Sequence, residues 1–173
     1  MKKVLFIFLL LSFSPGFAQN LNEIEKYLIE IVNLDRNETG LSSFVIDPLI
    51  SEAAKIQADY LSTINTIKEV SHSNPILKYR SATDRIRKVS NLKYDLSSEN
   101  ITAFFYNASK TSLEIAEQIH SNFMNSKYHR INLLREVKYK DITYPSYYGH
   151  CIIHNRKLNY IIAVQMFPVL NFN

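Results

Sequence analysis

The chain has 173 residues, a formal net charge of +4, 46% hydrophobic residues, three glycines and one cysteine. A single cysteine, Cys151, excludes an internal disulfide, so the fold must depend on a hydrophobic core. The basic residues form no concentrated stripe, which argues against nucleic-acid binding, and the length fits one domain.

Residues 1–18 are predicted to be a cleaved signal peptide. Two lysines precede an unbroken apolar run at residues 4–11, which is too short to span a bilayer and has no polar residues at helical spacing. Cleavage after Ala18 would remove both lysines and lower the net charge to +2. We therefore expect a secreted or periplasmic monomer, formed by residues 19–173, with no transmembrane segment in the mature chain.

The first half of this mature chain is predicted to be mainly helical. Apolar residues recur every three or four positions over residues 20–35, which predicts an amphipathic helix. Asp47 and Pro48 suit the N-cap and first position of a second helix. Thr111 and Glu114 have the spacing of a capping box and predict the start of a further helix.

The remaining apolar segments favour strands. Residues 101–106 are apolar and aromatic, which predicts a short strand. Residues 137–144, 147–154 and 158–167 are rich in β-branched and aromatic residues, and a polar connection separates the last two. This arrangement predicts an antiparallel meander. Helices early in the chain and strands late predict an α+β fold, with helices packed on an antiparallel sheet.

A series of spaced motifs runs through the chain between residues 24 and 167. In order, they are Asn33-x-x-Arg36-x-x-x-Gly40-Leu41, Asp47-Pro48-Leu49-x-x-x-Ala53-Ala54, Ser71-His72, Ser98-Glu99-Asn100-Ile101, Phe123-Met124-Asn125-Ser126-x-x-His129-Arg130-x-Asn132-Leu133-Leu134 and Val164-Gln165-x-Phe167. This ordered set resembles the CAP superfamily of cysteine-rich secretory, antigen 5 and pathogenesis-related 1 proteins, especially its secreted, cysteine-poor bacterial members. The resemblance implies an α-β-α sandwich with helices on both sides of a central antiparallel sheet.

The resemblance also implies a surface cleft that contains two histidines and acidic residues. Carried over by motif, the histidines are His72 and His129, and the first acid is Glu99. Ser126 stands where many family members have a second glutamate, so we place it in the cleft as a polar residue. His72, His129 and Glu99 are then the candidate ligands of a divalent cation such as Zn²⁺.

Two functions remain open for this cleft. Two imidazoles and a carboxylate could hold Zn²⁺ with a bound water, which would make the protein a metal-assisted hydrolase acting on peptides or cell-surface material. The alternative is a binding module with weak affinity for cations and for an extracellular ligand such as a lipid or a glycan. The missing second acid favours the binding module, although Glu114 or Glu117 could reach the cleft from the same helix. Ser126 and His129 lack the nucleophile elbow of a serine hydrolase.

The other histidines and the cysteine have simpler explanations. We expect His120 to be exposed or at a helix edge. His150 and His154 share one face of a strand, which we interpret as a solvated face. Cys151 is predicted to be a small buried hydrophobic residue rather than a reactive thiol. A third explanation of the whole protein is an interaction domain whose cleft has no present role.

Overall fold

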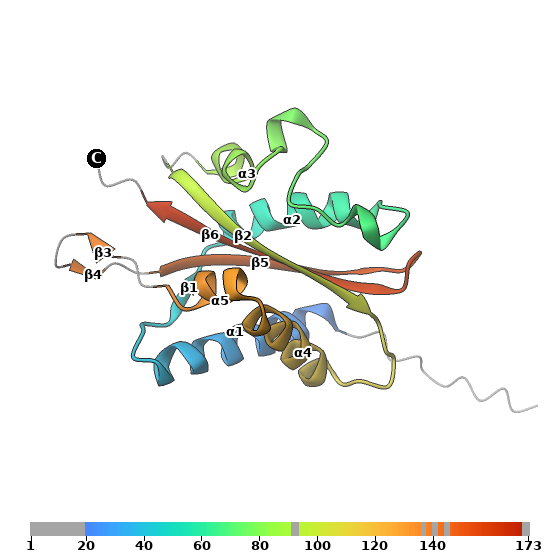
Figure 1. Ribbon diagram of the computed structural model, residues 1–173, viewed down its shortest axis with the longest axis horizontal. Coiled ribbons are helices and arrows are strands. Elements are labelled where there is room, and N and C mark those ends of the chain that lie inside the picture. Colours follow the sequence, from blue (N-terminus) through green and yellow to red (C-terminus); the bar gives the residue numbers. More distant parts are fainter. Residues whose placement is uncertain (1–19, 91–93, 136–137, 140–141, 144–145, 171–173) are drawn as a thin grey trace, which may run out of the picture.

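The computed structural model describes residues 20–90, 94–135, 138–139, 142–143 and 146–170, and they form a sandwich of three layers (Figure 1). The predicted signal peptide and its cleavage site lie outside these residues. The α-helices are α1 (Leu21–Glu38), α2 (Pro48–Ser62), α3 (Ala82–Val89), α4 (Ser112–Asn125) and α5 (Lys127–Leu133). The strands are β1 (Phe44–Ile46), β2 (Tyr94–Phe105), β3 (Lys138–Tyr139), β4 (Ile142–Thr143), β5 (Ser146–Asn155) and β6 (Tyr160–Leu170).

The central sheet has the strand order β1-β5-β6-β2. β2, β5 and β6 are antiparallel to their neighbours, but β1 runs parallel to Ser146–Tyr148 of β5. The prediction of a wholly antiparallel sheet is therefore wrong for β1. That prediction assumed strands joined by tight turns, which pair antiparallel. About a hundred residues separate β1 from β5, so these two strands are free to pair in parallel. β3 and β4 form a separate hairpin, so the predicted meander is confirmed only for β5 and β6.

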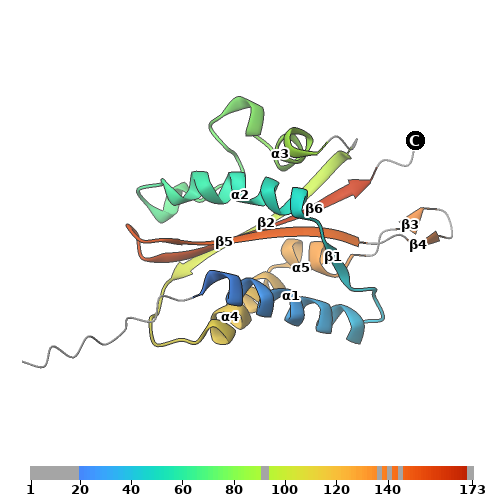
Figure 2. The same ribbon diagram turned by 180° about the vertical axis from the view of Figure 1, so that it is seen from behind.

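The sheet is covered on both faces, as Figures 1 and 2 show: α2 and α3 lie on one side, and α1, α4 and α5 on the other. β6 displays this arrangement residue by residue because its side chains alternate between the two cores. Ile161, Ala163 and Phe167 pack with α1, α4 and α5, whereas Ile162, Val164 and Met166 pack with α2 and α3. The α+β sandwich expected from the motifs is thus confirmed.

The helix starts agree well with local sequence signals. The Asp47 side chain accepts a hydrogen bond from Leu49 N at 2.8 Å and caps α2. Thr111 and Glu114 form the predicted capping box of α4. Ser81 begins α3 with a second capping box, whereas Asn20 makes no side-chain cap on α1. These devices satisfy the backbone N–H groups that the first turn of a helix leaves unpaired.

β2 is the element that most affects the site. The prediction began a strand at residue 101, but β2 begins at Tyr94 and pairs with β6 along its length. Its first half includes Ser97, Ser98, Glu99 and Asn100, a polar run that lacks a strand pattern. Pairing with β6 outweighs the weak local preference. As a result, Glu99 and Asn100 lie on a rigid strand at the edge of the sheet.

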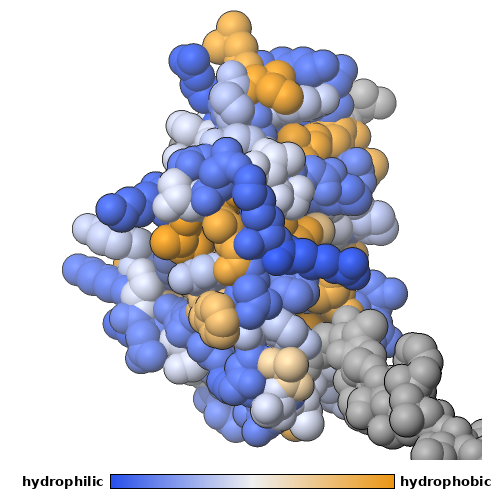
Figure 3. Space-filling model, turned by 90° about the vertical axis from the view of Figure 1, so that its right-hand side faces the viewer, coloured by the Kyte–Doolittle hydropathy of each residue, from blue (hydrophilic) through white to orange (hydrophobic). Residues whose placement is uncertain are grey.

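The surface is mixed in character. On the face drawn in Figure 3, hydrophobic side chains lie in separate groups among hydrophilic ones. None of the helices in the described part of the chain is both long enough and apolar enough to cross a membrane.

Candidate functional site

A cavity of about 570 Å³ opens beside β2, on the side of the sheet that carries α3. The loop before α3, the first turn of α3 and the polar half of β2 supply its walls. Its lining residues are His72, Ser73, Arg80, Ser81, Ala82, Ser97 and Glu99. The cavity therefore contains two of the residues predicted for the cleft, His72 and Glu99.

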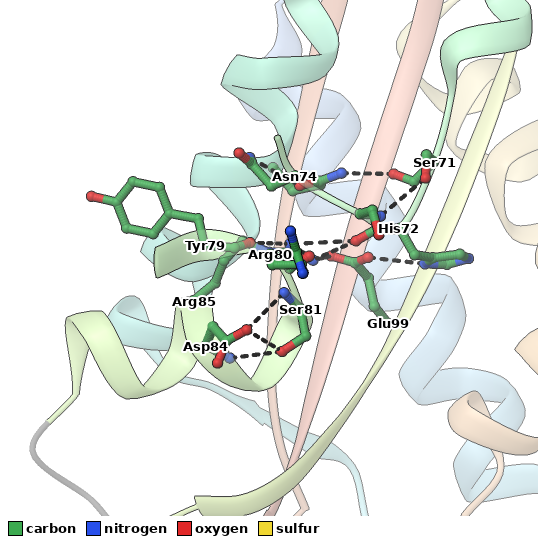
Figure 4. A network of polar contacts seen from close by, with 11 residues as sticks. Ser71, His72, Asn74, Tyr79, Arg80, Ser81, Asp84, Arg85 and Glu99 are labelled. Carbon is green, nitrogen blue, oxygen red and sulfur yellow. Dashed lines mark hydrogen bonds and ion pairs between the residues drawn. The ribbon is translucent and has the colours of Figure 1, made fainter. Parts of the chain in front are cut away.

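Glu99 lines this cavity, and each of its two carboxylate oxygens contacts another side chain (Figure 4). One oxygen lies 2.9 Å from Nδ1 of His72, and the other accepts a hydrogen bond from Nη2 of Arg85. The Arg85 side chain is fully buried and the Glu99 side chain is only 3% exposed. A buried carboxylate is stable only when its charge is paired, and Arg85 provides that charge.

Arg85 also organises the loop that carries His72. Its Nη1 donates to the backbone carbonyl oxygens of Tyr79 at 2.8 Å, Arg80 at 3.3 Å and His72 at 3.4 Å. The segment before α3, which lacks any regular sequence pattern, is thereby fixed from inside (Figure 4). Arg85 was not among the residues predicted for the cleft, since an arginine in a short amphipathic helix gives no signal that it is buried.

A second set of bonds anchors the same loop to α2. Gln57, which is fully buried, donates from Nε2 to the carbonyl oxygen of Ser71 at 2.7 Å. Its amide oxygen accepts from Nδ2 of Asn74 at 3.2 Å. His72 therefore projects from a loop whose backbone is held on both sides, and its own side chain remains 60% exposed.

His129 approaches from the opposite layer of the sandwich, on α5. Nδ2 of the fully buried Asn100 donates to the carbonyl oxygen of His129 at 3.1 Å, and Asn132 donates to Oδ1 of Asn100 at 2.8 Å. The His129 ring meets the ring of Phe123 edge-on at 5.4 Å. Burial lowers the pKa of His129, and the nearby charge of His72 lowers it further. His129 is therefore near enough to His72 for its charge to affect the pKa of His129, although His129 is not in the cavity lining.

Ser126 lies at the junction of α4 and α5, where it ends one helix and precedes the other. Its side chain makes no capping hydrogen bond to α5 and does not line the cavity. Glu114, one of the two acids considered as a replacement, is bonded to Thr111 at the other end of α4. Glu117, the other candidate, is exposed on the same helix.

The fit to a metal ion can be judged from these donors. Within the described residues, no three His, Cys, Asp or Glu side chains are grouped so that they could hold a metal ion. Glu99 is paired with Arg85 and His72. It is therefore better placed to orient the His72 ring toward a metal ion than to bind the metal itself. A cation at this site would depend on Nε2 of His72 and on His129. Metal binding by His72, His129 and Glu99 together therefore stays a prediction.

Two histidines outside the cleft differ from expectation, whereas Cys151 differs only in being less buried than expected. His120, expected to be exposed or at a helix edge, is only 9% exposed, and its Nε2 lies 2.7 Å from a carboxylate oxygen of Asp35, so the first of these two expectations is wrong. His150 is 8% exposed, so the predicted solvated face is also wrong. The face is buried because α1 packs over it. Cys151 is half-buried, and burial raises the pKa of its thiol to about 12, which keeps it unreactive.

Comparison with known proteins tests the fold. No protein-family model matches the chain, and no curated protein sequence matches it either. An outer surface protein of Borrelia burgdorferi aligns with a TM-score of 0.65 at 18% identity, over 88% of this chain and 96% of that one. An extracellular protein of Bacillus anthracis containing an SCP domain aligns with a TM-score of 0.56 at 21% identity, over 86% of this chain. The chain has the CAP fold.

A third structure supports the same assignment. A cysteine-rich secretory protein of Staphylococcus aureus aligns with a TM-score of 0.55 at 18% identity over 88% of this chain. The chain spans 41% of the Bacillus protein and 40% of the Staphylococcus protein, which is less than half of each. Structural similarity at 18–21% identity shows the fold alone, so the assignment of the cleft depends on its own geometry.

Proposed function

We propose that this protein is an extracellular binding module in which the CAP-domain cleft at His72 holds a polar ligand. Two considerations support an extracellular location. The structural neighbours are described as an outer surface protein, an extracellular protein and a secretory protein. The chain also begins with a segment that has the pattern of a signal peptide.

The pairing of Glu99 carries the proposal of binding rather than catalysis. A general base or a metal-binding carboxylate must present an oxygen to the reacting water or to the metal. Both oxygens of Glu99 are already engaged by His72 and by the buried Arg85. The acid therefore stabilises the cleft and orients His72, which supports a rigid recognition surface.

The rest of the lining indicates the kind of ligand. Three serines, Ser73, Ser81 and Ser97, line the cavity together with Arg80 and the exposed His72. The hydroxyl group of Ser97 is buried and has no hydrogen-bond partner among the described residues. Hydroxyl and guanidinium groups match the hydroxyls and carboxylates of a glycan better than an apolar chain. We therefore favour a glycan that carries an acidic group.

The test is calorimetric titration of the mature protein with two matched sets of soluble oligosaccharides, one neutral and one containing uronic acids. We expect saturable binding of the acidic set, weakened about tenfold or more by His72→Ala and by Arg80→Ala. Arg156→Ala is the matched control, because Arg156 is exposed in the turn between β5 and β6 and is not in the cavity lining. Binding that is unchanged in both cleft variants would contradict the proposal.

The hydrolase alternative has its own test. A screen of peptide and ester substrates, with and without a chelator, measures any metal-assisted activity of the mature protein. Activity that disappears both with the chelator and in the His72→Ala, His129→Ala double variant would replace the binding proposal. We expect no such activity, because Glu99 is already paired and no second acid takes the position of Ser126.

A further inference from the structure

A second cavity, of about 380 Å³, lies at the opposite edge of the sheet from the His72 cleft. It opens between the first two turns of α1, the end of β1, the start of α2 and the middle of β5. Its lining includes Asn22, Glu25, Ile29, Ile46, Ser51 and His150. Its volume suits a small ligand, and none of these residues belongs to the cleft described above.

This cavity exists because β1 is short. β1 pairs with β5 only as far as Tyr148, and the chain then turns into α2. Beyond that point, no other described strand covers this edge of β5. Glu25 reaches across from α1 and accepts a hydrogen bond from the backbone N–H of Ile152 at 2.9 Å. A side-chain carboxylate thus takes the place of the missing strand.

The charge of Glu25 has no compensating partner within the described residues. Burial raises the pKa of this carboxyl, and the hydrogen bond from Ile152 only partly opposes that effect. The neighbouring base, Lys26, lies 3.9 Å from Glu30 on the exposed side of the helix. The carboxylate at the floor of the cavity therefore lacks a cation, while a basic side chain stands at the rim.

His150 forms another wall and is only 8% exposed. Its ring lies 5.2 Å from the ring of Tyr148, and its Nδ1 has no hydrogen-bond partner among the described residues. Burial lowers the pKa of His150 to about 4, so the ring is neutral at physiological pH. A neutral imidazole and the Ser51 hydroxyl can accept hydrogen bonds from a ligand cation without repelling it.

We propose that this cavity binds a small zwitterion of the α-amino acid type, with its ammonium group on Glu25 and its carboxylate toward Lys26 at the rim. Glu25, His150 and Ser51 offer acceptors to the three donors of an ammonium group. Asn22 and Lys26 offer donors to a carboxylate. Ile29 and Ile46 provide apolar surface for a short aliphatic side chain.

The test uses L-valine and two analogues that each lack one charged group, isobutylamine and isovalerate. Binding is followed in the mature protein by the ¹⁵N and ¹H shifts of the Ile152 amide, which reports on Glu25 directly. We expect saturable shifts with valine and an affinity about tenfold or more above that of either analogue. Equal affinity for one analogue would overturn the proposal, as would no saturation at about 50 mM valine.

Two variants separate the roles of the charges. Glu25→Gln keeps an oxygen that can accept from Ile152 N but removes the charge, so we expect about tenfold weaker binding of valine and of isobutylamine. Lys26→Met should weaken valine binding and leave isobutylamine binding unchanged. Glu23→Gln is the matched control, since Glu23 is an exposed acid on the same helix outside the cavity. Loss of binding in this control, or tighter binding of Zn²⁺ than of valine at the same amide, would overturn the proposal.

Discussion

Arg85 of α3 buries its guanidinium group against the carboxylate of Glu99 on β2, so an almost fully buried ion pair joins the two sides of the cleft. The same guanidinium group supports the loop of His72 through three carbonyl oxygens. This pair of side chains therefore contributes both to the packing of α3 on β2 and to the shape of the cleft.

Removing the cation of this pair should be costly. Arg85→Met leaves Glu99 buried without its partner, and we expect a loss of about 3–5 kcal/mol in the free energy of unfolding, measured by urea denaturation. Lys88→Met, on an exposed position of the same helix, should change it by less than about 0.5 kcal/mol. The double variant Arg85→Met, Glu99→Leu should recover part of the loss. Equal effects of Arg85→Met and Lys88→Met would contradict a structural role for the pair.

His150 should make stability depend on pH. Burial lowers its pKa from 6.5 to about 4, so the unfolded chain binds a proton at a higher pH than the folded protein does. Its contribution to stability is complete above pH 6.5 and decreases as the pH falls toward 4. The decrease amounts to about 3 kcal/mol. Urea denaturation between these pH values should show this decrease in the wild type relative to His150→Phe, and parallel curves for the two proteins would refute it.

Gly149 marks the closest approach of α2 to the sheet. A Cβ atom there would lie 2.3 Å from the backbone carbon of Ile50 and from the backbone nitrogen of Ser51. Backbone cannot move aside as a side chain does, so Gly149→Ala should lower the free energy of unfolding by about 3 kcal/mol or more. Gly40→Ala meets open space but a φ of +78°, and should cost only about 1 kcal/mol. Urea denaturation of both variants checks the prediction, and a larger loss in Gly40→Ala than in Gly149→Ala would contradict it.

Asn100 should stabilise α5 against local unfolding. Its side chain donates to the His129 carbonyl oxygen and to Gln165 Oε1, and accepts from Asn132. In Asn100→Ala these buried groups lose their partners, at a cost of about 1–3 kcal/mol for each unsatisfied group. Hydrogen exchange should then become faster in α5 than in α2. Uniform acceleration in both helices would indicate a global loss of stability instead.

Zinc binding should be weak. With Glu99 paired to Arg85, a cation would rely on two imidazoles, and we expect a Kd above about 1 μM by calorimetry at pH 7. The His72→Ala, His129→Ala double variant should abolish binding, and His154→Ala should leave it unchanged. Nanomolar affinity in the wild type would show that the carboxylate leaves Arg85 to bind the metal.

What the sequence predicted well was local or carried by motif. The caps at Asp47 and Thr111 depend on neighbouring residues, so spacing was enough to find them. Several motif positions also proved to be scaffold: Asn33 bonds to the backbone of Phe44 at 2.7 Å, and Asn100 bonds to Gln165. These amides join neighbouring elements of the fold and do not line the cleft.

What the sequence could not predict depends on distant pairing. The direction of β1 is decided by β5, which lies a hundred residues later, and the polar first half of β2 becomes a strand only beside β6. Arg85 is buried because α3 packs against β2, and His150 because α1 packs against β5, and neither residue type indicates this burial. The edge position of Glu99, which determines its chemistry, belongs to the same class.

Arg36, near the end of α1, is 1% exposed and donates to the carbonyl oxygen of Leu133 at 2.6 Å and to that of Arg135 at 3.0 Å. It also donates to the hydroxyl group of Ser146, 110 residues further along the chain. A chain made from its N-terminus therefore completes the surroundings of its first helix only after its last third has emerged. Arg36 can therefore make its full set of contacts only after Ser146 has been synthesised.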